Sequence, residues 1–269
     1  MSSISSKATD VDQTRRTFIK CAAATLAATA ASMGYAATAS ADPAEKTANA
    51  NDGAASVDDI VWDEEYDVLI AGARAAGMAV AATVATEGEG ATALLLEKGG
   101  AEWGNGNSIF SSEMCTFTED PENYTEYLKE MRGEFTGTPD DVLEAFGAEL
   151  GENYNWVVNI LGADPEELVI YTDEDFATEW AELPHSGGRL MLQFRKDNES
   201  GNTHLARFLS NKITEEWSDV ITEKTETPLL ALVQNPQTRE VLGGVYRGED
   251  GANVYVRARR DVEIGRAHV

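Results

Sequence analysis

The sequence predicts an α/β fold in which a mostly parallel sheet is flanked by helices and followed by a β-meander. A β-rich apolar run at 66–71 (YDVLIA) leads through a glycine turn into a small-residue helical segment and a second apolar run at 91–96. From position 220 onward, short apolar segments alternate with turn residues, which is typical of a meander. The order strand, turn, helix, strand is that of a Rossmann-like nucleotide-binding unit.

The composition argues against two classes of partner. The chain has 269 residues and a formal net charge of −26, so nucleic acid and anionic membranes would repel it. Its two cysteines and three histidines are scattered and lack the spacing of a metal site. We therefore expect neither a nucleic-acid partner nor a bound metal.

The first 41 residues predict a twin-arginine signal peptide. The segment 14–20 (TRRTFIK) resembles the twin-arginine export consensus, an alanine-rich apolar run follows, and 39–41 (ASA) offers a cleavage site. The apolar run is short for a spanning helix, so we expect no stable membrane span after cleavage. The predicted location is periplasmic or otherwise extracytoplasmic, which includes the cell surface. Residues 42–60 lack apolar periodicity and are expected to form a flexible leader.

The turn after the first strand reads GARAAG from Gly72 to Gly77, one letter away from the dinucleotide fingerprint G-x-G-x-x-G. Arg74 stands where the fingerprint has its second glycine, which lets the backbone approach phosphate. The helix expected over 75–86 would place Ala76, Val80 and Val84 at helical spacing, with Gly77 close to the strand. Its amino terminus is suited to a pyrophosphate.

An acidic residue stands where a nucleotide-binding fold would place one. Glu97, followed by Lys98, ends the second apolar run and lies 25 positions after Gly72. Such folds use an acid at this point to bind the adenosine ribose. A structural strand–helix–strand unit without a ligand is the alternative interpretation.

Together with 102–114 (EWGNGNSIFSSEM) and 227–246 (TPLLALVQNPQTREVLGGVY), this unit resembles the N-terminal part of FAD-dependent oxidoreductases of the fumarate reductase/succinate dehydrogenase flavoprotein superfamily. Exported fumarate- and urocanate-reductase-like enzymes are similar, and 3-ketosteroid dehydrogenases are more distant. The resemblance implies a partial FAD-binding domain over 61–260, truncated before the capping domain. It implies that FAD is bound by Gly72, Ala76, Gly77, Glu97, Lys98, Gly106, Asn107, Ser108 and, at the adenine, Leu229. At 111–113 the chain departs from the family pattern, since Ser-Ser-Glu replaces a small glycine-rich run.

The remaining elements follow from periodicity. Helices are expected over 121–135, with an apolar face of Tyr124, Tyr127, Leu128 and Met131, and over 139–161, with one of Val142, Leu143, Phe146 and Leu150. A third helix is expected over 201–217, with Leu205, Phe208, Leu209 and Ile213 turned inward. Strands are expected at 220–222, 229–234, 241–246 and 254–259. No catalytic residue can be named, and His185 and His204 lack a partner base or nucleophile.

The end of the chain departs from the family pattern. Residues 263–269 (EIGRAHV) can be back-translated into the start of a sequencing-library adapter, and we expect 261–269 to be a non-native tail. A genuine short C-terminus is the alternative.

Arg74 leaves three interpretations open: its side chain turns to solvent, it caps a phosphate, or the letter is an error.

The resemblance implies a function as well as a fold. Intact relatives reduce an activated C=C of an unsaturated carboxylate by hydride transfer from FAD, with a small-molecule substrate and an external electron donor. A flavin dehydrogenase of the 3-ketosteroid type and a non-catalytic binding protein on the same fold are the alternatives. Because the relatives place substrate groups in the cap, we expect this chain to be inactive alone.

Overall fold

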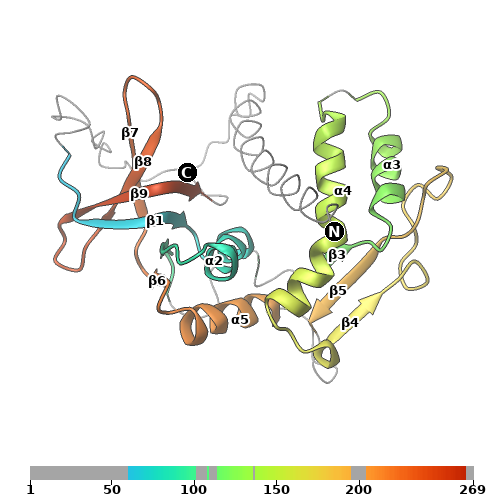
Figure 1. Cartoon of the computed structure of the whole chain (residues 1–269), viewed down its shortest axis with the longest axis horizontal. Coiled ribbons are helices and arrows are strands. Elements are labelled where there is room, and N and C mark those ends of the chain that lie inside the picture. Colours follow the sequence, from blue (N-terminus) through green and yellow to red (C-terminus); the bar gives the residue numbers. More distant parts are fainter. Residues whose placement is uncertain (1–59, 101–107, 109–113, 136, 195–203, 265–269) are drawn as a thin grey trace, which may run out of the picture. The chain divides into compact units, whose positions relative to one another are not determined.

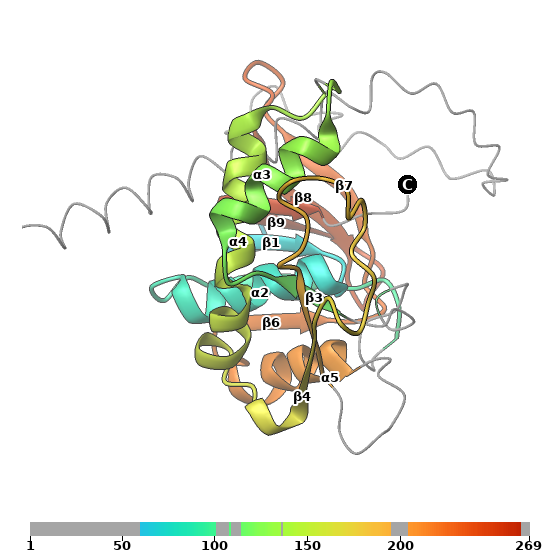
Figure 2. The ribbon, with the colours of Figure 1, turned by 90° about the vertical axis from the view of Figure 1, so that its right-hand side faces the viewer.

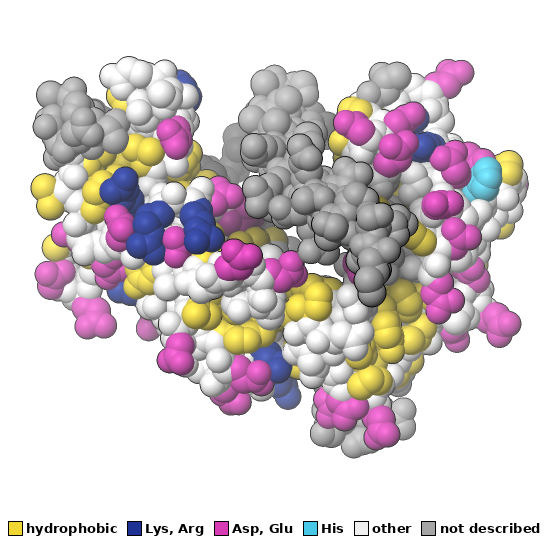
Figure 3. Space-filling view, viewed as in Figure 1, with side chains coloured by type: hydrophobic (Ala, Val, Ile, Leu, Met, Phe, Trp, Pro, Cys, Tyr) yellow, Lys and Arg dark blue, Asp and Glu magenta, His cyan; other side chains and the backbone are white. Residues whose placement is uncertain are grey.

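The computed structural model describes residues 60–100, 108, 114–135, 137–194 and 204–264. These residues form two compact units (Figure 1). One comprises 116–154 and 171–191, and the other comprises 60–115, 155–170 and 192–264, each within the described ranges. Acidic side chains are scattered over the face drawn in Figure 3, in keeping with the net charge of −26.

The second unit is built on a six-stranded sheet with the strand order β6-β2-β1-β9-β8-β7. Its strands are β1 (Glu64–Ala71), β2 (Ala93–Leu96), β6 (Ile221–Lys224), β7 (Leu229–Gln234), β8 (Val241–Arg247) and β9 (Asn253–Ile264). The first four in the sheet order run parallel, whereas β9, β8 and β7 form an antiparallel meander. The predicted parallel sheet with a meander is confirmed.

Apolar residues of β1 and β2 alternate between the two faces of this sheet. Ile70 and Leu95 pack with α2 (Ala75–Glu87) and α5 (His204–Asn211), whereas Leu69 and Leu94 pack with residues of the meander. The central strands are buried on both faces, which is why they read as continuous apolar runs.

The helix α2 presents a different face to the sheet from the one expected. Its buried residues are Gly77, Met78, Ala81 and Ala82, and Ala76 is exposed. Val80 and Val84 pack only partly against the core. The close contact of Gly77 with the preceding turn fixes this rotation, and the smallest side chains then allow the helix to lie near the sheet.

The strand β9 belongs to both parts of the sheet and is longer than the expected 254–259. Its first residues pair antiparallel with β8, and it pairs in parallel with β1 as far as Ala71 and Ile264. Residues 261–264, in the predicted tail, therefore contribute to this ladder. The residues around Asp261 are charged, so this part of the strand shows no apolar pattern in the sequence. Its strand structure is defined by backbone hydrogen bonds and not by its side chains.

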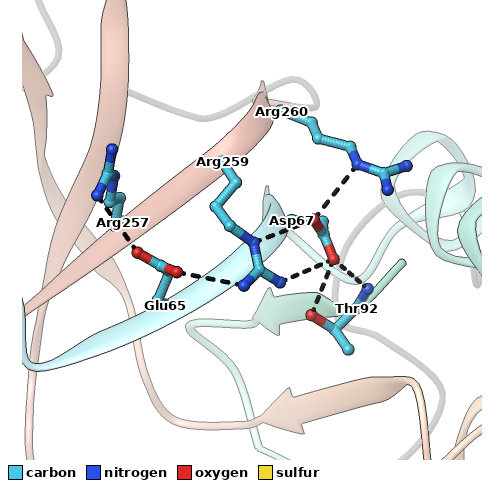
Figure 4. Close-up of polar contacts among 6 residues, drawn as sticks. All are labelled: Glu65, Asp67, Thr92, Arg257, Arg259 and Arg260. Carbon is cyan, nitrogen blue, oxygen red and sulfur yellow. Dashed lines mark hydrogen bonds and ion pairs between the residues drawn. The ribbon is translucent and has the colours of Figure 1, made fainter. Parts of the chain in front are cut away.

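An ion-pair cluster ties the start of β1 to β9 (Figure 4). Asp67 accepts hydrogen bonds from Arg259 Nη2 at 2.9 Å, from Arg259 Nε at 3.1 Å and from the Thr92 backbone nitrogen at 2.9 Å, and Arg260 Nε lies 3.3 Å away. The Arg259 guanidinium is the main cause that lowers the pKa of Asp67 to about 2, with the Thr92 amide next. Glu65 accepts from the other side of Arg259 at 3.2 Å.

The other unit contains α3 (Pro121–Arg132) and α4 (Asp140–Asn155). Asp120 caps α3 by accepting from the Asn123 backbone nitrogen at 3.0 Å. The expected face of α3 is confirmed, since Tyr124 and Tyr127 form a buried cluster with Leu150, and Leu128 and Met131 pack against it.

The expected apolar face of α4 needs a correction. Leu150 is buried as expected, but Phe146 is 46% exposed, and Gly147 is buried in its place. The reason is steric, because a Cβ on Gly147 would lie 1.9 Å from Thr125 Oγ1. Only glycine permits α3 and α4 to approach so closely there, and this contact turns Phe146 outward.

Three short strands escaped the sequence prediction. They are β3 (Cys115–Phe117), β4 (Leu168–Tyr171) and β5 (Leu190–Phe194), which form a sheet in the order β3-β5-β4. Short helical turns occur at η3 (Trp156–Ile160), η4 (Pro165–Glu167) and η5 (Lys212–Glu216). Leu209 and Ile213 are buried as expected for the helix that α5 and η5 form. No helix among the described residues is both long and apolar enough to cross a membrane.

Candidate nucleotide-binding site

The turn between β1 and α2 depends on both of its outer glycines. Gly72 has φ of +105°, a value that side chains rarely tolerate, and its N–H donates to the Leu96 carbonyl at 2.7 Å. A Cβ on Gly77 would lie 2.0 Å from the Gly72 carbonyl oxygen. The helix can therefore sit directly against the turn only because position 77 lacks a side chain.

Arg74 occupies a backbone conformation that any residue can adopt. Its φ of −107° and ψ of 179° are extended, and its carbonyl accepts the first helical hydrogen bond from the Met78 N–H at 2.8 Å. Arginine here does not strain the folded backbone. A glycine at this position would matter only for the approach of a ligand.

The amino terminus of α2 offers hydrogen-bond donors. Since Met78 donates the first helical bond, the N–H groups of Ala76 and Gly77 have no partner within the helix. Ala75 donates its N–H to Ser108 Oγ at 3.2 Å. The first turn of α2 contains no acidic residue, so its partial positive charge is available to an anion.

Glu97 connects this turn to the segment that follows β2. It is 2% exposed, and its carboxylate accepts from the Ala73 N–H at 2.9 Å and from the Gly99 N–H at 2.8 Å. Its backbone also pairs with Lys224 and Thr227, at 2.9 and 2.8 Å. Each carboxylate oxygen can still accept a second hydrogen bond, so a ribose hydroxyl could be bound without breaking either contact.

A second carboxylate lies near Glu97 and was not found from the sequence. Glu223 precedes Lys224 at the end of β6 and pairs with Leu95 of β2. Burial, and then the charge of Glu97, raise the pKa of Glu223. No signal in the sequence could have revealed this neighbour, because the pairing of β6 with β2 joins segments far apart in the chain.

The structure brings most of the expected site residues together. Gly72, Ala76, Gly77, Glu97 and Ser108 surround the turn and the start of α2. Lys98 follows Glu97 and is exposed. The expected contacts of Gly106 and Asn107 lie outside the described residues.

Leu229 begins β7, two residues after Thr227, whose N–H donates to the Glu97 carbonyl at 2.8 Å. Its side chain packs against the core cluster of Leu69 and Tyr246.

Among the described residues, no group of histidine, cysteine and acidic side chains is arranged to hold a metal ion.

No family model and no curated protein matches the chain. Solved structures do. The 3-ketosteroid-Δ4-(5α)-dehydrogenase from Rhodococcus jostii RHA1 is 20% identical, with a TM-score of 0.59 over 78% of this chain and 47% of that one. The 3-ketosteroid Δ1-dehydrogenase from Sterolibacterium denitrificans is 15% identical, with a TM-score of 0.58 over 75% of this chain and 47% of that one. A flavocytochrome c3 fumarate reductase in its open conformation is 19% identical, with a TM-score of 0.52 over 76% of this chain and 34% of that one.

The chain thus spans about half of the two steroid dehydrogenases and a third of the fumarate reductase. The level of identity establishes a shared fold, and the glycine turn, α2 and Glu97 lie within a mixed α/β unit of that kind. The chain has the α/β fold, a mostly parallel sheet flanked by helices, that these dehydrogenases and this reductase share with it.

Proposed function

We propose that the turn at 72–77 and the start of α2 bind the diphosphate of FAD, and that the chain belongs to a flavin-dependent oxidoreductase. The observation that carries the proposal is the contact of Gly77 with the Gly72 carbonyl. It sets the first turn of α2 against the end of β1, beside a buried acid at the end of β2. This combination suits a dinucleotide.

The described residues fit the cofactor. The N–H groups of Ala76 and Gly77 and the hydroxyl of Ser108 would bind the diphosphate, and Glu97 would accept from the adenosine ribose. When bound, FAD supplies hydride transfer, while protein groups decide which substrate receives it. The contribution of this chain is to hold and orient the cofactor.

For the reaction, we propose reduction of an activated C=C of an unsaturated carboxylate, with electrons from an external donor. A dehydrogenase of the 3-ketosteroid type is the second candidate, favoured by the TM-scores of 0.59 and 0.58 against two such enzymes, compared with 0.52 for the fumarate reductase. A binding protein without flavin is the third. We further propose that the protein is exported by the twin-arginine route and that the 269-residue chain has no turnover by itself.

Retention of flavin tests the cofactor. The purified chain is refolded with FAD, free FAD is removed by gel filtration, and the absorbance spectrum is recorded. We expect the flavin bands to co-elute with the protein. A protein that folds but elutes without flavin would support the binding protein and contradict the proposal.

The catalytic part has its own assay. Two reactions are measured with the pure chain: reoxidation of reduced flavin by fumarate, and reduction of oxidised flavin by a 3-ketosteroid. We expect neither to occur, and either one would show that the chain is active by itself.

A further inference from the structure

The end of β9 carries an acidic residue next to the turn that is assigned to the diphosphate. β9 lies beside β1 in the sheet, and α2 packs on one of the sheet's faces (Figure 2). In the parallel ladder Glu263 is paired with Ile70, and the pair of Ala71 and Ile264 follows. Ile70 stands two positions before Gly72, so Glu263 lies close to the level at which the turn begins.

The alternation along β9 directs the Glu263 side chain to the face of the sheet on which α2 packs. Val262 packs against the apolar cluster of Leu69 on the opposite face. Successive side chains of a strand point to opposite faces, so Asp261 and Glu263 both point to the face of α2. Ile70, the neighbour of Glu263 in β1, agrees with this direction, because it belongs to the apolar cluster that contains the buried residues of α2.

The first turn of α2 rests on this neighbour of Glu263. A Cβ on Gly77 would lie 3.2 Å from Ile70 Cγ2. Adjacent strands are about 4.8 Å apart, so the Glu263 side chain starts one strand spacing from the residue that supports the helix. Glu263 is half-buried, and burial, followed by the charge of Asp261, raises the pKa of its carboxyl. The carboxylate therefore lies beside the amino terminus of α2.

The strand order determines which part of a bound nucleotide comes near Glu263. Glu97, the proposed acceptor for the adenosine ribose, ends β2 on one side of β1, and β9 lies on the other side. A nucleotide with its ribose at Glu97 and its first phosphate at α2 therefore extends towards β9 with its second phosphate. In FAD this phosphate is esterified and carries one negative charge, whereas the terminal phosphate of ADP carries about 1.5–2 at neutral pH.

We propose that Glu263 makes this site discriminate against a free terminal phosphate, so that it favours a diphosphate esterified at both ends, such as that of FAD, over ADP. The inference rests on the proposed function, since it takes the nucleotide to lie across β2, β1 and β9 as described there. Like charges brought together are unfavourable, and they act against wrong partners more than they weaken the right one. The first turn of α2 contains no acidic residue, so this discrimination comes from β9.

Isothermal titration calorimetry of the full chain with ADP and with FAD, in the wild type, E263Q and D261N, tests this inference. D261N is the matched control, because it removes the same charge from the same strand and face, about 6.6 Å further from the turn. We expect E263Q to bind ADP about fivefold more tightly than the wild type does, and FAD at most about twofold more tightly. D261N should bind both nucleotides as the wild type does. The gain for ADP should shrink at high salt, because a charge causes it.

The results separate this inference from the proposed function. If none of these proteins binds either nucleotide, the proposed function is contradicted, and the role of Glu263 with it. If the nucleotides bind but E263Q gains no more affinity for ADP than D261N does, or gains equally for ADP and FAD, the role of Glu263 alone is overturned. Weaker binding of FAD by E263Q would also overturn it, because the carboxylate would then accept a hydrogen bond from the cofactor. The expected result is a gain of affinity, which damage to the fold would not produce.

Discussion

The carboxylate of Glu97 accepts a hydrogen bond from the backbone N–H of Ala73 at 2.9 Å, so the residue that ends β2 holds the turn that follows β1. The same carboxylate accepts from Gly99 at 2.8 Å. Glu97 therefore shapes the phosphate turn before any ribose is present. A single buried acid serves the fold and, in the proposed function, the ligand.

Replacing Glu97 by glutamine should weaken both the fold and the proposed binding of the ligand. The amide presents N–H donors where the carboxylate accepts from two backbone N–H groups, so we expect a loss of about 1–3 kcal/mol in the free energy of unfolding. Urea denaturation measures this loss, with the exposed Glu249→Gln as the control. An E97Q protein as stable as E249Q would show that the two hydrogen bonds contribute little.

Replacing Arg74 by glycine should separate stability from binding. The extended backbone of Arg74 needs no glycine, and added chain entropy should lower stability by about 0.5–1 kcal/mol. Removing the long side chain should at the same time tighten FAD binding, because backbone can then approach the diphosphate. Fluorescence titration with FAD gives the affinity. An unchanged affinity in R74G would refute the crowding argument, and a weaker affinity would in addition favour a phosphate-capping guanidinium.

Replacing Asp67 by asparagine should change the pH dependence of stability. The pKa of Asp67 is about 2 in the folded chain and 3.8 in the reference state, so the unfolded chain binds more protons between these values. The stabilisation is therefore complete above pH 5 and lost as the pH falls towards 2. After allowance for the partly exposed Arg259, we expect it to be about 1–2 kcal/mol.

The measurement for Asp67 is the difference in unfolding free energy between the wild type and D67N, from urea denaturation at several pH values between 3 and 7. The exposed Asp219→Asn is the control. A difference that stays constant down to pH 3 would mean that the ion pair with Arg259 does not set the pKa of Asp67.

The local parts of the fold could be predicted from the sequence. The strand at 66–71, the glycine turn and the acid at Glu97 lie within one short stretch, and each has a pattern tied to its backbone role. The face of α2 was misassigned because Gly77 packs against the turn and excludes Ala76 from the core. Phe146 was misassigned for a similar reason at Gly147.

The non-local parts could not be predicted. The neighbour Glu223 depends on the pairing of β6 with β2, two segments that meet only in the fold. The strands β3, β4 and β5 have three to five residues, which is too short for a pattern of alternation to be distinguished from a loop.

The most direct test of the central claim is a fluorescence titration of the refolded chain with FAD and with FMN, in the wild type and in G77A. A methyl group on Gly77 must displace the Gly72 carbonyl, at a cost of about 1–3 kcal/mol, whereas G100A adds its methyl group in open space and serves as the matched control. We predict that the wild type and G100A bind FAD with saturation and more tightly than FMN, which lacks the adenosine half, and that G77A loses this binding. Equal affinity of the wild type for FAD and FMN, or FAD binding that G77A leaves intact, would contradict the claim that this turn binds a dinucleotide.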